Sequence, residues 1–254
     1  MTLTWLADVA RTAGLDVREV DGWRTRGVKL RNGQLAKIDP RIVVDHHTAS
    51  RQGSPNPSLR ICTYGRSDLA GPLCNILIGR DSTVWIIAAG QTNNAGRISV
   101  PQFNAFHNAH TIGVEIENDG IGEPWTDQLC DTSARLDAAI CAHLGWTAER
   151  CIAHKEAAIP RGRKTDPSWD QNEHRARVAK ILTDTGDEMA LAKYMTKGLA
   201  MQRLEQVCRK HRDADMSIDD RRWLEADTDA RIAKGEPIDP LIDWWDAALY
   251  AEGA

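Results

Sequence analysis

Short apolar runs bounded by polar turns fill the first two thirds of the chain and predict several β-strands. The run Ile42–Val44 is apolar at every position, which is typical of a strand buried on both faces of a sheet. Residues 75–79 and 83–87 are two further apolar runs, and the Arg-Asp-Ser sequence between them predicts a hairpin. In residues 111–117 apolar side chains alternate with Thr, Gly and Glu, so we expect a strand with one face turned to the core.

Segments with helical spacing of apolar residues follow these strands. Across residues 126–144, Leu and Ile recur every three or four positions, and Gly145 supplies a typical helix end. Asp170 and Glu173 form a capping-box pattern that begins another helix, expected to run to about Leu182. Strands mixed with amphipathic helices indicate an α/β fold, with a mixed central β-sheet covered by helices.

The first 35 residues carry a predicted helix and strand of their own. Thr4 is a candidate N-cap for a short apolar helix that Gly14 ends, and residues 17–20 alternate as in a strand. We therefore expect residues 1–35 to form an accessory αβ segment in front of a main domain at residues 36–186.

A change in charge marks a domain boundary near Gly186. Residues 187–254 hold 15 acidic and 10 basic residues, whereas the rest of the chain is nearly balanced. Caps and spacing predict three helices there and a small all-α region; the helices begin near residue 189, at Ser217 and at Asp239. Trp244 and Trp245 follow the spacing of the last helix, so the core of a helical bundle explains them better than a sugar-stacking platform.

The composition narrows the classes of function. The chain has 254 residues and a formal net charge of −4, which disfavours nucleic acid as the main partner. No apolar run reaches the roughly 18 residues of a membrane span, and the first residues lack the basic start and apolar core of a secretory signal. The six cysteines form no CxxC pair, which suits buried free thiols and predicts a reducing compartment.

Three separated segments carry side chains of the kind that bind metals. His46 and His47 end the first apolar strand, His154 follows the apolar run 151–153, and Asp166 lies 12 residues further on. Two histidines and one carboxylate, with a fourth position for water, are typical of a catalytic zinc site. Such a site acidifies its water and polarises a carbonyl group. The spacing alone leaves open the alternative that these are buried structural histidines.

Four ordered motifs resemble those of the type 2 N-acetylmuramoyl-L-alanine amidases, which share a fold with peptidoglycan recognition proteins. The motifs are Val43–Ala49, Thr111–Glu115, Ile152–His154 and Lys164–Pro167. The resemblance covers about residues 36–183. It implies a zinc amidase domain at residues 36–186 that hydrolyses the amide between N-acetylmuramic acid and L-alanine in peptidoglycan.

Carried over residue by residue, the resemblance implies a zinc ion bound by His46, His154 and Asp166. The first histidine of the motif's pair is the ligand, so His46 is chosen over its neighbour. Glu115 matches the glutamate that activates the water on zinc. Lys164 matches the lysine that stabilises the tetrahedral oxyanion.

Two positions depart from the family pattern. Cys74, beside Asn75, stands where some relatives carry tyrosine, and Asn94 stands before Ala-Gly where many relatives carry histidine. Asn94 can hydrogen-bond a substrate, but it cannot shuttle a proton. We place Asn94, Asn75 and His47 among the candidate substrate-binding residues.

Each of these roles has a simpler alternative. Glu117, on the same face of the strand, is expected to lie on the surface, and Glu115 would then be a surface residue too. Lys164 would be one charge of a basic loop. Asp166 would cap a turn before a proline. Asp45 either supports the adjacent ligand or is ordinary strand polarity. The remaining histidines are expected to be structural or on the surface; they are His107, His110, His143, His174 and His211.

The expected biological role is that of a phage endolysin, which stays in the host cytoplasm until it is released to the cell wall. The segments Gly22–Gly27 and Gly71–Asp81 resemble those of phage endolysins in the family. The helices after residue 186 would then bind the wall or form a homo-oligomer. The alternatives are a non-catalytic peptidoglycan-binding module, a cytoplasmic muropeptide-recycling amidase and a regulator that binds another protein.

Overall fold

A computed structural model describes residues 2–100 and 104–184, together with isolated positions further along the chain. The chain divides into two compact units, residues 1–181 and residues 182–254. The three helices expected in residues 187–254, and their expected use in wall binding or self-association, lie outside the described residues apart from the isolated positions. These positions are Leu204, 223–224, 226–228, 230–231, Leu241 and Trp245.

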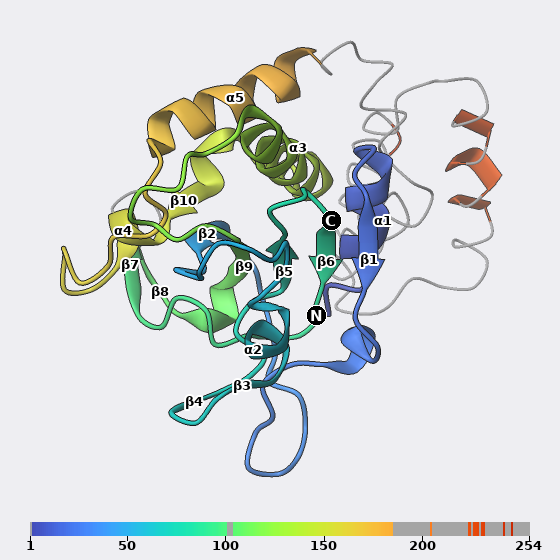
Figure 1. The fold of residues 1–254 in the computed structure, drawn as a ribbon. Coiled ribbons are helices and arrows are strands. Elements are labelled where there is room, and N and C mark those ends of the chain that lie inside the picture. The colour runs from blue at the N-terminus through green and yellow to red at the C-terminus, as the bar shows by residue number, and fades with distance from the viewer. Residues whose placement is uncertain are drawn as a thin grey trace. The chain divides into compact units, whose positions relative to one another are not determined.

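Six strands form the central sheet of the first unit, in the order β1-β6-β5-β9-β2-β10 (Figure 1). β5 and β6 pair antiparallel, as the predicted hairpin requires, and all other neighbours pair in parallel. The strands are β1 (Val17–Glu19), β2 (Ile42–His47), β5 (Ile76–Ile78), β6 (Val84–Ile86), β9 (Thr111–Ile116) and β10 (Cys151–Ala153). The expected mixed sheet is confirmed.

Short helices and hairpins connect these strands. The α-helices up to residue 184 are α1 (Leu6–Thr12), α2 (Leu59–Tyr64), α3 (Asp127–Leu144), α4 (His154–Ala157) and α5 (Gln171–Asp184). The 3-10 helices are η1 (Trp23–Thr25), η2 (Asn108–His110) and η3 (Ala148–Arg150). Two hairpins pair β3 (Gly65–Arg66) with β4 (Leu69–Ala70), and β7 (Ile98–Val100) with β8 (Asn104–Phe106). Within the described part of the chain, no helix has the length and apolar character needed to cross a membrane.

The predicted helix ends are visible as caps. The hydroxyl of Thr126 accepts the Leu129 N–H at 3.2 Å where α3 begins, and Gly145 ends α3 with a left-handed backbone. The Asp170 carboxylate accepts the N–H groups of Asn172 and Glu173, at 2.8 and 3.3 Å, where α5 begins. Both helices therefore start where the sequence predicts.

The central strands are buried on both faces because apolar side chains point to both sides. On β9, Ile112, Val114 and Ile116 pack into the same cluster as α1 and α3. On β2, Val43 joins that cluster, whereas its neighbours in sequence face a second one with Ile98 and Ile152. Because of this alternation, α3 packs on one face of the sheet, and the site described below lies on the opposite face.

The N-terminal segment differs from the expectation. Residues 1–35 belong to the same compact unit as the main domain, not to a separate accessory segment. β1 pairs in parallel with β6 and extends the sheet, and Leu6, Ala7 and Ala10 of α1 are fully buried in the main core. The physical reason is the apolar face of α1, which packs against α3 and so completes the core.

The described cysteines are unbridged. Cys62, Cys74, Cys141 and Cys151 are buried, and Cys130 is half-buried. The prediction of free, mostly buried thiols is confirmed for these residues, whereas the reducing compartment stays a prediction.

Candidate metal centre

Three neighbouring parallel strands bring the predicted residues to one edge of the sheet. His46 lies near the end of β2, directly opposite Glu115 on β9, and β10 on the other side of β2 leads straight into His154. Because parallel strands end at the same edge, residues distant in sequence meet there. The alternation of side chains puts His46 and Glu115 on the sheet face that does not carry α3.

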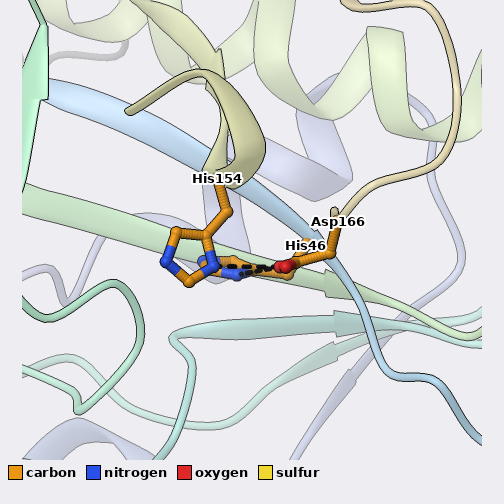
Figure 2. Close-up of side chains that lie close together, drawn as sticks. All are labelled: His46, His154 and Asp166. Carbon is orange, nitrogen blue, oxygen red and sulfur yellow. Dashed lines mark hydrogen bonds and ion pairs between the residues drawn. The ribbon is translucent and has the colours of Figure 1, made fainter. Parts of the chain in front are cut away.

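Asp166 completes a tight cluster with the two histidines (Figure 2). Its Oδ2 atom lies 2.9 Å from Nδ1 of His46 and 3.0 Å from Nδ1 of His154. The backbone N–H of Lys155 donates to the Asp166 carbonyl at 2.7 Å, which ties the loop of the carboxylate to the start of α4. Both histidine side chains are almost fully buried, and Asp166 is nearly so.

The donor set fits a divalent metal ion. The second nitrogen of His154, Nε2, lies 3.2 Å from the Ala95 carbonyl, and when Nε2 carries the ring proton it donates to that carbonyl and Nδ1 turns its lone pair toward Asp166. Because a lone pair and a carboxylate oxygen repel each other, each contact between Nδ1 and Asp166 needs either a shared proton or a metal cation between the two atoms. Burial lowers the pKa of His46 to about 4, which keeps that ring neutral as a metal ligand requires.

The Asp166 carboxyl is held ionised in this cluster. Burial opposes ionisation, but hydrogen bonds with His154 and His46 outweigh it, so the pKa of Asp166 lies well below its usual range. One carboxylate oxygen and two imidazole nitrogens are a ligand set that zinc accepts. Within the described residues, these three side chains place one ligand atom each within 4.8 Å of one another.

Glu115 lies beside the cluster, and one of its carboxylate oxygens accepts no hydrogen bond from the part of the chain that the structure describes. Its Oε2 atom is buried and has no hydrogen-bond partner among the described residues. Burial, and then the nearby charges of Asp166 and Glu117, raise the pKa of Glu115 to about 8. A carboxyl group with a raised pKa next to a metal site is suited to take up and release a proton. The surface alternative for Glu115 therefore does not fit its position.

Lys164 is half-buried in the loop that carries Asp166. Its charge lowers the pKa of Glu115 and contributes to the lowered pKa of His46. The role of Lys164 as an oxyanion partner stays a prediction.

His47 packs between two loops at the rim of the cluster. Its Nδ1 atom accepts the Ser168 N–H at 3.2 Å, and its ring stacks with Trp125 at a centroid distance of 6.5 Å. A Cβ on Gly120 would overlap the other side of the ring. His47 is half-buried, so it forms part of the wall beside Asp166, and substrate contact by His47 stays a prediction.

Asn75 requires a correction. It is fully buried, and its amide donates to the carbonyls of Ala88 and Gly90, both at 2.9 Å. Its oxygen accepts the Gly113 N–H at 3.0 Å and the Thr92 hydroxyl at 3.3 Å. Asn75 therefore crosslinks backbone segments inside the core and has no hydrogen-bonding group free for a substrate.

Asn94 is nearer to the cluster but is also held by the protein. Its oxygen accepts the Thr111 hydroxyl at 2.9 Å, and its amide donates to the Thr92 hydroxyl at 2.8 Å. Its side chain packs on Gly113, where a Cβ would collide with it. These contacts fix the start of the Asn94-Ala95-Gly96 turn, and binding of substrate by Asn94 stays a prediction.

Glu117 was predicted to lie on the surface and is instead fully buried. Its carboxylate accepts the Ser58 N–H at 2.7 Å and the hydroxyls of Thr48 and Ser50 at 2.7 and 2.5 Å. Arg80 lies 3.6 Å away and also donates to the Ser50 carbonyl at 2.9 Å. Glu117 thereby fastens the loop after β2 to the end of β9. The hydroxyl-rich composition of that loop was the signal in the sequence.

A second buried cluster lies on the α3 side of β2. Nε2 of His174 lies 2.8 Å from Asp137 and 3.7 Å from Asp45, and the Gln171 amide donates to Asp45 at 3.0 Å. Burial raises the pKa of Asp45 to about 8 and that of Asp137 to about 7. A structural role for His174 stays a prediction, because Asp45, Asp137 and His174 also place one ligand atom each within 4.8 Å of one another. Asp45 connects α5 to the strand that carries His46.

Comparison with known proteins identifies a family for most of the first unit. The sequence model of one protein family, described as N-acetylmuramoyl-L-alanine amidase, matches residues 36–169. No curated protein matches the chain.

Several solved structures are similar at low identity. A selenomethionine AmpD derivative is 20% identical, with 64% of this chain and 94% of that one covered and a TM-score of 0.48. The endolysin of the Thermus scotoductus bacteriophage Ph2119 is 19% identical, with 64% and 98% covered and a TM-score of 0.42. AmpDh3 from Pseudomonas aeruginosa, in complex with anhydromuramic pentapeptide, is 19% identical, with 62% and 65% covered and a TM-score of 0.42.

Proposed function

Because the chain belongs to the N-acetylmuramoyl-L-alanine amidase family, we propose that it is a zinc-dependent hydrolase of peptidoglycan. The bond cleaved is the amide between N-acetylmuramic acid and L-alanine of the stem peptide. The observation that carries the proposal is the convergence of the His46 and His154 Nδ1 atoms on one oxygen of Asp166, beside Glu115.

His46, His154 and Asp166 would hold the zinc ion. When bound, the ion supplies an acidified water and polarises the amide carbonyl. Glu115 accepts the proton of the attacking water and passes it to the nitrogen of L-alanine as the C–N bond breaks. The Lys164 ammonium stabilises the negative charge that develops on the carbonyl oxygen, an effect worth about 3–4 kcal/mol in comparable oxyanion sites.

A specific observation favours hydrolysis over binding alone. The resemblance implies that binding-only members of the superfamily lack the full ligand set. In this chain Asp166 is present and lies within hydrogen-bond distance of both histidines. Glu115 beside them would have no use in a protein that only binds peptidoglycan.

We also propose that the enzyme acts as a phage endolysin that lyses the host from the cytoplasm. The motifs at Gly22–Gly27 and Gly71–Asp81 support this role. The competing role is recycling of soluble muropeptides. Loss of turbidity of isolated cell walls supports the endolysin, whereas cleavage of soluble muropeptide without loss of turbidity supports recycling.

The deciding experiment compares three samples on purified peptidoglycan. These are the wild type, the wild type treated with a chelator and the Glu115→Ala variant. We expect new L-alanine amino groups with the wild type alone, and recovery of the chelated sample when zinc is returned. Equal release by all three samples would contradict the proposed mechanism.

A further inference from the structure

The Ala95 carbonyl, which lies against Nε2 of His154, belongs to the Ala95–Gly96 peptide group, and the local backbone does little to fix the orientation of that group. Ala95 and Gly96 share that planar group, so the Ala95 C=O and the Gly96 N–H point in opposite directions. Gly96 has a φ of +67°, and a Cβ there would meet nothing within 4 Å. Because glycine tolerates several backbone conformations, this peptide group can rotate at little cost unless another residue fixes it.

Asn108 supplies the missing restraint. Its side-chain oxygen accepts the Gly96 N–H at 2.7 Å and the Ala95 N–H at 3.0 Å. Holding the N–H edge of the peptide group turns the opposite edge, the Ala95 carbonyl, toward His154. That carbonyl lies 3.2 Å from Nε2 of His154, and both residues are buried.

Asn108 is itself placed firmly. It begins η2, and the carbonyls of the other two η2 residues accept backbone N–H groups from the segment before β2. Asp39 donates to Ala109, and Arg41 donates to His110, both at 2.8 Å. The Asn108 carbonyl also accepts the Thr111 hydroxyl at 3.2 Å, at the first residue of β9. The position of Asn108 is therefore set by the two central strands of the sheet.

We propose that Asn108 is a positioning residue of the metal centre, which acts through the Ala95 carbonyl on the ring of His154. Fixing the Ala95–Gly96 peptide group keeps the Ala95 carbonyl opposite Nε2, which holds the His154 ring in the orientation that turns Nδ1 toward Asp166. Groups that orient a metal-binding histidine in this way typically change metal affinity about 10–100-fold when they are removed. The proposal rests on the proposed use of His154 as a ligand.

Zinc affinity of the full-length chain is the first test, measured by competition with a chromophoric chelator. We expect Asn108→Ala to bind zinc about 10–100-fold more weakly than the wild type. Asn108→Asp keeps an acceptor oxygen at the same place and should restore most of the affinity. Asn32→Ala, which removes an exposed asparagine that bonds only within its own loop, is the control and should bind like the wild type.

Comparing Asn108→Gln with Asn108→Asp separates a loss of the acceptor position from a general loss of folding. Asn108→Gln keeps the amide but moves its oxygen by one methylene group, so it should lose affinity while Asn108→Asp keeps it. Nitrogen NMR of the zinc-loaded proteins, in which zinc occupies Nδ1, then follows the exchange of the His154 Nε2–H with water. We expect slow exchange in the wild type and Asn108→Asp, because the Ala95 carbonyl accepts this hydrogen, and faster exchange in Asn108→Ala and Asn108→Gln.

Failure of the inference is distinguishable from failure of the proposed function. A wild type that binds no zinc contradicts the proposed zinc centre, and with it the role of Asn108. A wild type that binds zinc, with equal affinity and equally slow Nε2–H exchange in Asn108→Ala, overturns the inference alone.

Discussion

His46 on β2 and Glu115 on β9 are direct partners in the parallel ladder, so the first candidate metal ligand and the candidate base lie at one level of the sheet. Backbone hydrogen bonds on both sides of this pair set the separation of the two side chains. The pairing of a ligand with a base is therefore a property of the strand register. A substitution of either side chain should therefore change the reaction of the site but leave the pairing of β2 with β9 intact.

The first prediction concerns Glu115→Gln, which removes the base but keeps the shape of the side chain. We expect kcat on peptidoglycan to fall about 10²–10⁴-fold, because a general base contributes that much to such reactions. Zinc content, measured on the same protein, should stay at the wild-type level. The exposed Glu149→Gln variant is the matched control and should turn over normally; equal turnover by both variants would remove Glu115 from the mechanism.

The second prediction concerns Glu117→Ala. The variant leaves the Ser58 N–H and the hydroxyls of Thr48 and Ser50 without their buried acceptor, whereas Arg80 keeps its ion pair with Glu123. Because each buried donor left unsatisfied costs about 1–3 kcal/mol, the free energy of unfolding in urea should fall by roughly 3 kcal/mol. Asp68→Ala removes an exposed partner of Arg66 and should cost less than about 1 kcal/mol. Similar values for the two variants would contradict the anchoring role of Glu117.

The third prediction compares two glycines of one loop. Gly120 has a φ of +71°, and a Cβ there would overlap His47, whereas Gly122 has open space around it. Gly120→Ala should lower the free energy of unfolding by more than about 1 kcal/mol, since L side chains disfavour this backbone region. It should also lower activity, because His47 contacts the loop of Asp166. Gly122→Ala should do neither, and comparable losses in both variants would refute the argument.

The fourth prediction is a dependence of stability on pH through Asp45. Burial raises the pKa of Asp45 from 3.8 to about 8, so the folded state holds a proton that the unfolded state releases. Above pH 4 the wild type therefore loses stability from this residue as the pH rises, until the pH reaches about 8. Asp45→Asn carries no such proton and should gain stability relative to the wild type across that window.

The measurement is chemical unfolding of the metal-free proteins at several pH values from 4 to 8. Asp68→Asn, at an exposed aspartate, controls for the general effect of an added amide. A difference between Asp45→Asn and the wild type that is the same at every pH would show that Asp45 is not protonated in the fold.

The grouping of the candidate ligands is the part of the site that the sequence predicts best. His46, Glu115 and His154 each follow or end a recognisable apolar run, and the structure brings them to one edge of the sheet. Asp166 lies in a loop with no periodic signal. Residue type and the resemblance placed it with the two histidines, and it lies within hydrogen-bond distance of both.

The residues that support the centre were not predictable in the same way. Glu117 and Glu115 lie on the same face in the alternating pattern of β9. The loop that follows β2 nevertheless covers Glu117, and the Ser58 N–H in that loop donates to its carboxylate. Asn75 resembles a free polar residue in sequence, but the strand order surrounds its amide with backbone carbonyls. Periodicity tells which face a side chain takes, and only the completed fold tells what covers that face.

The centre joins side chains separated by 120 residues along the chain, from β2 to the loop after α4. A chain that ends at β9 would hold one of the three proposed ligands. The proposed centre therefore exists only where β10 is paired with β2 and the loop after α4 has brought in Asp166. Zinc content of a sample should then count the molecules whose central sheet is complete.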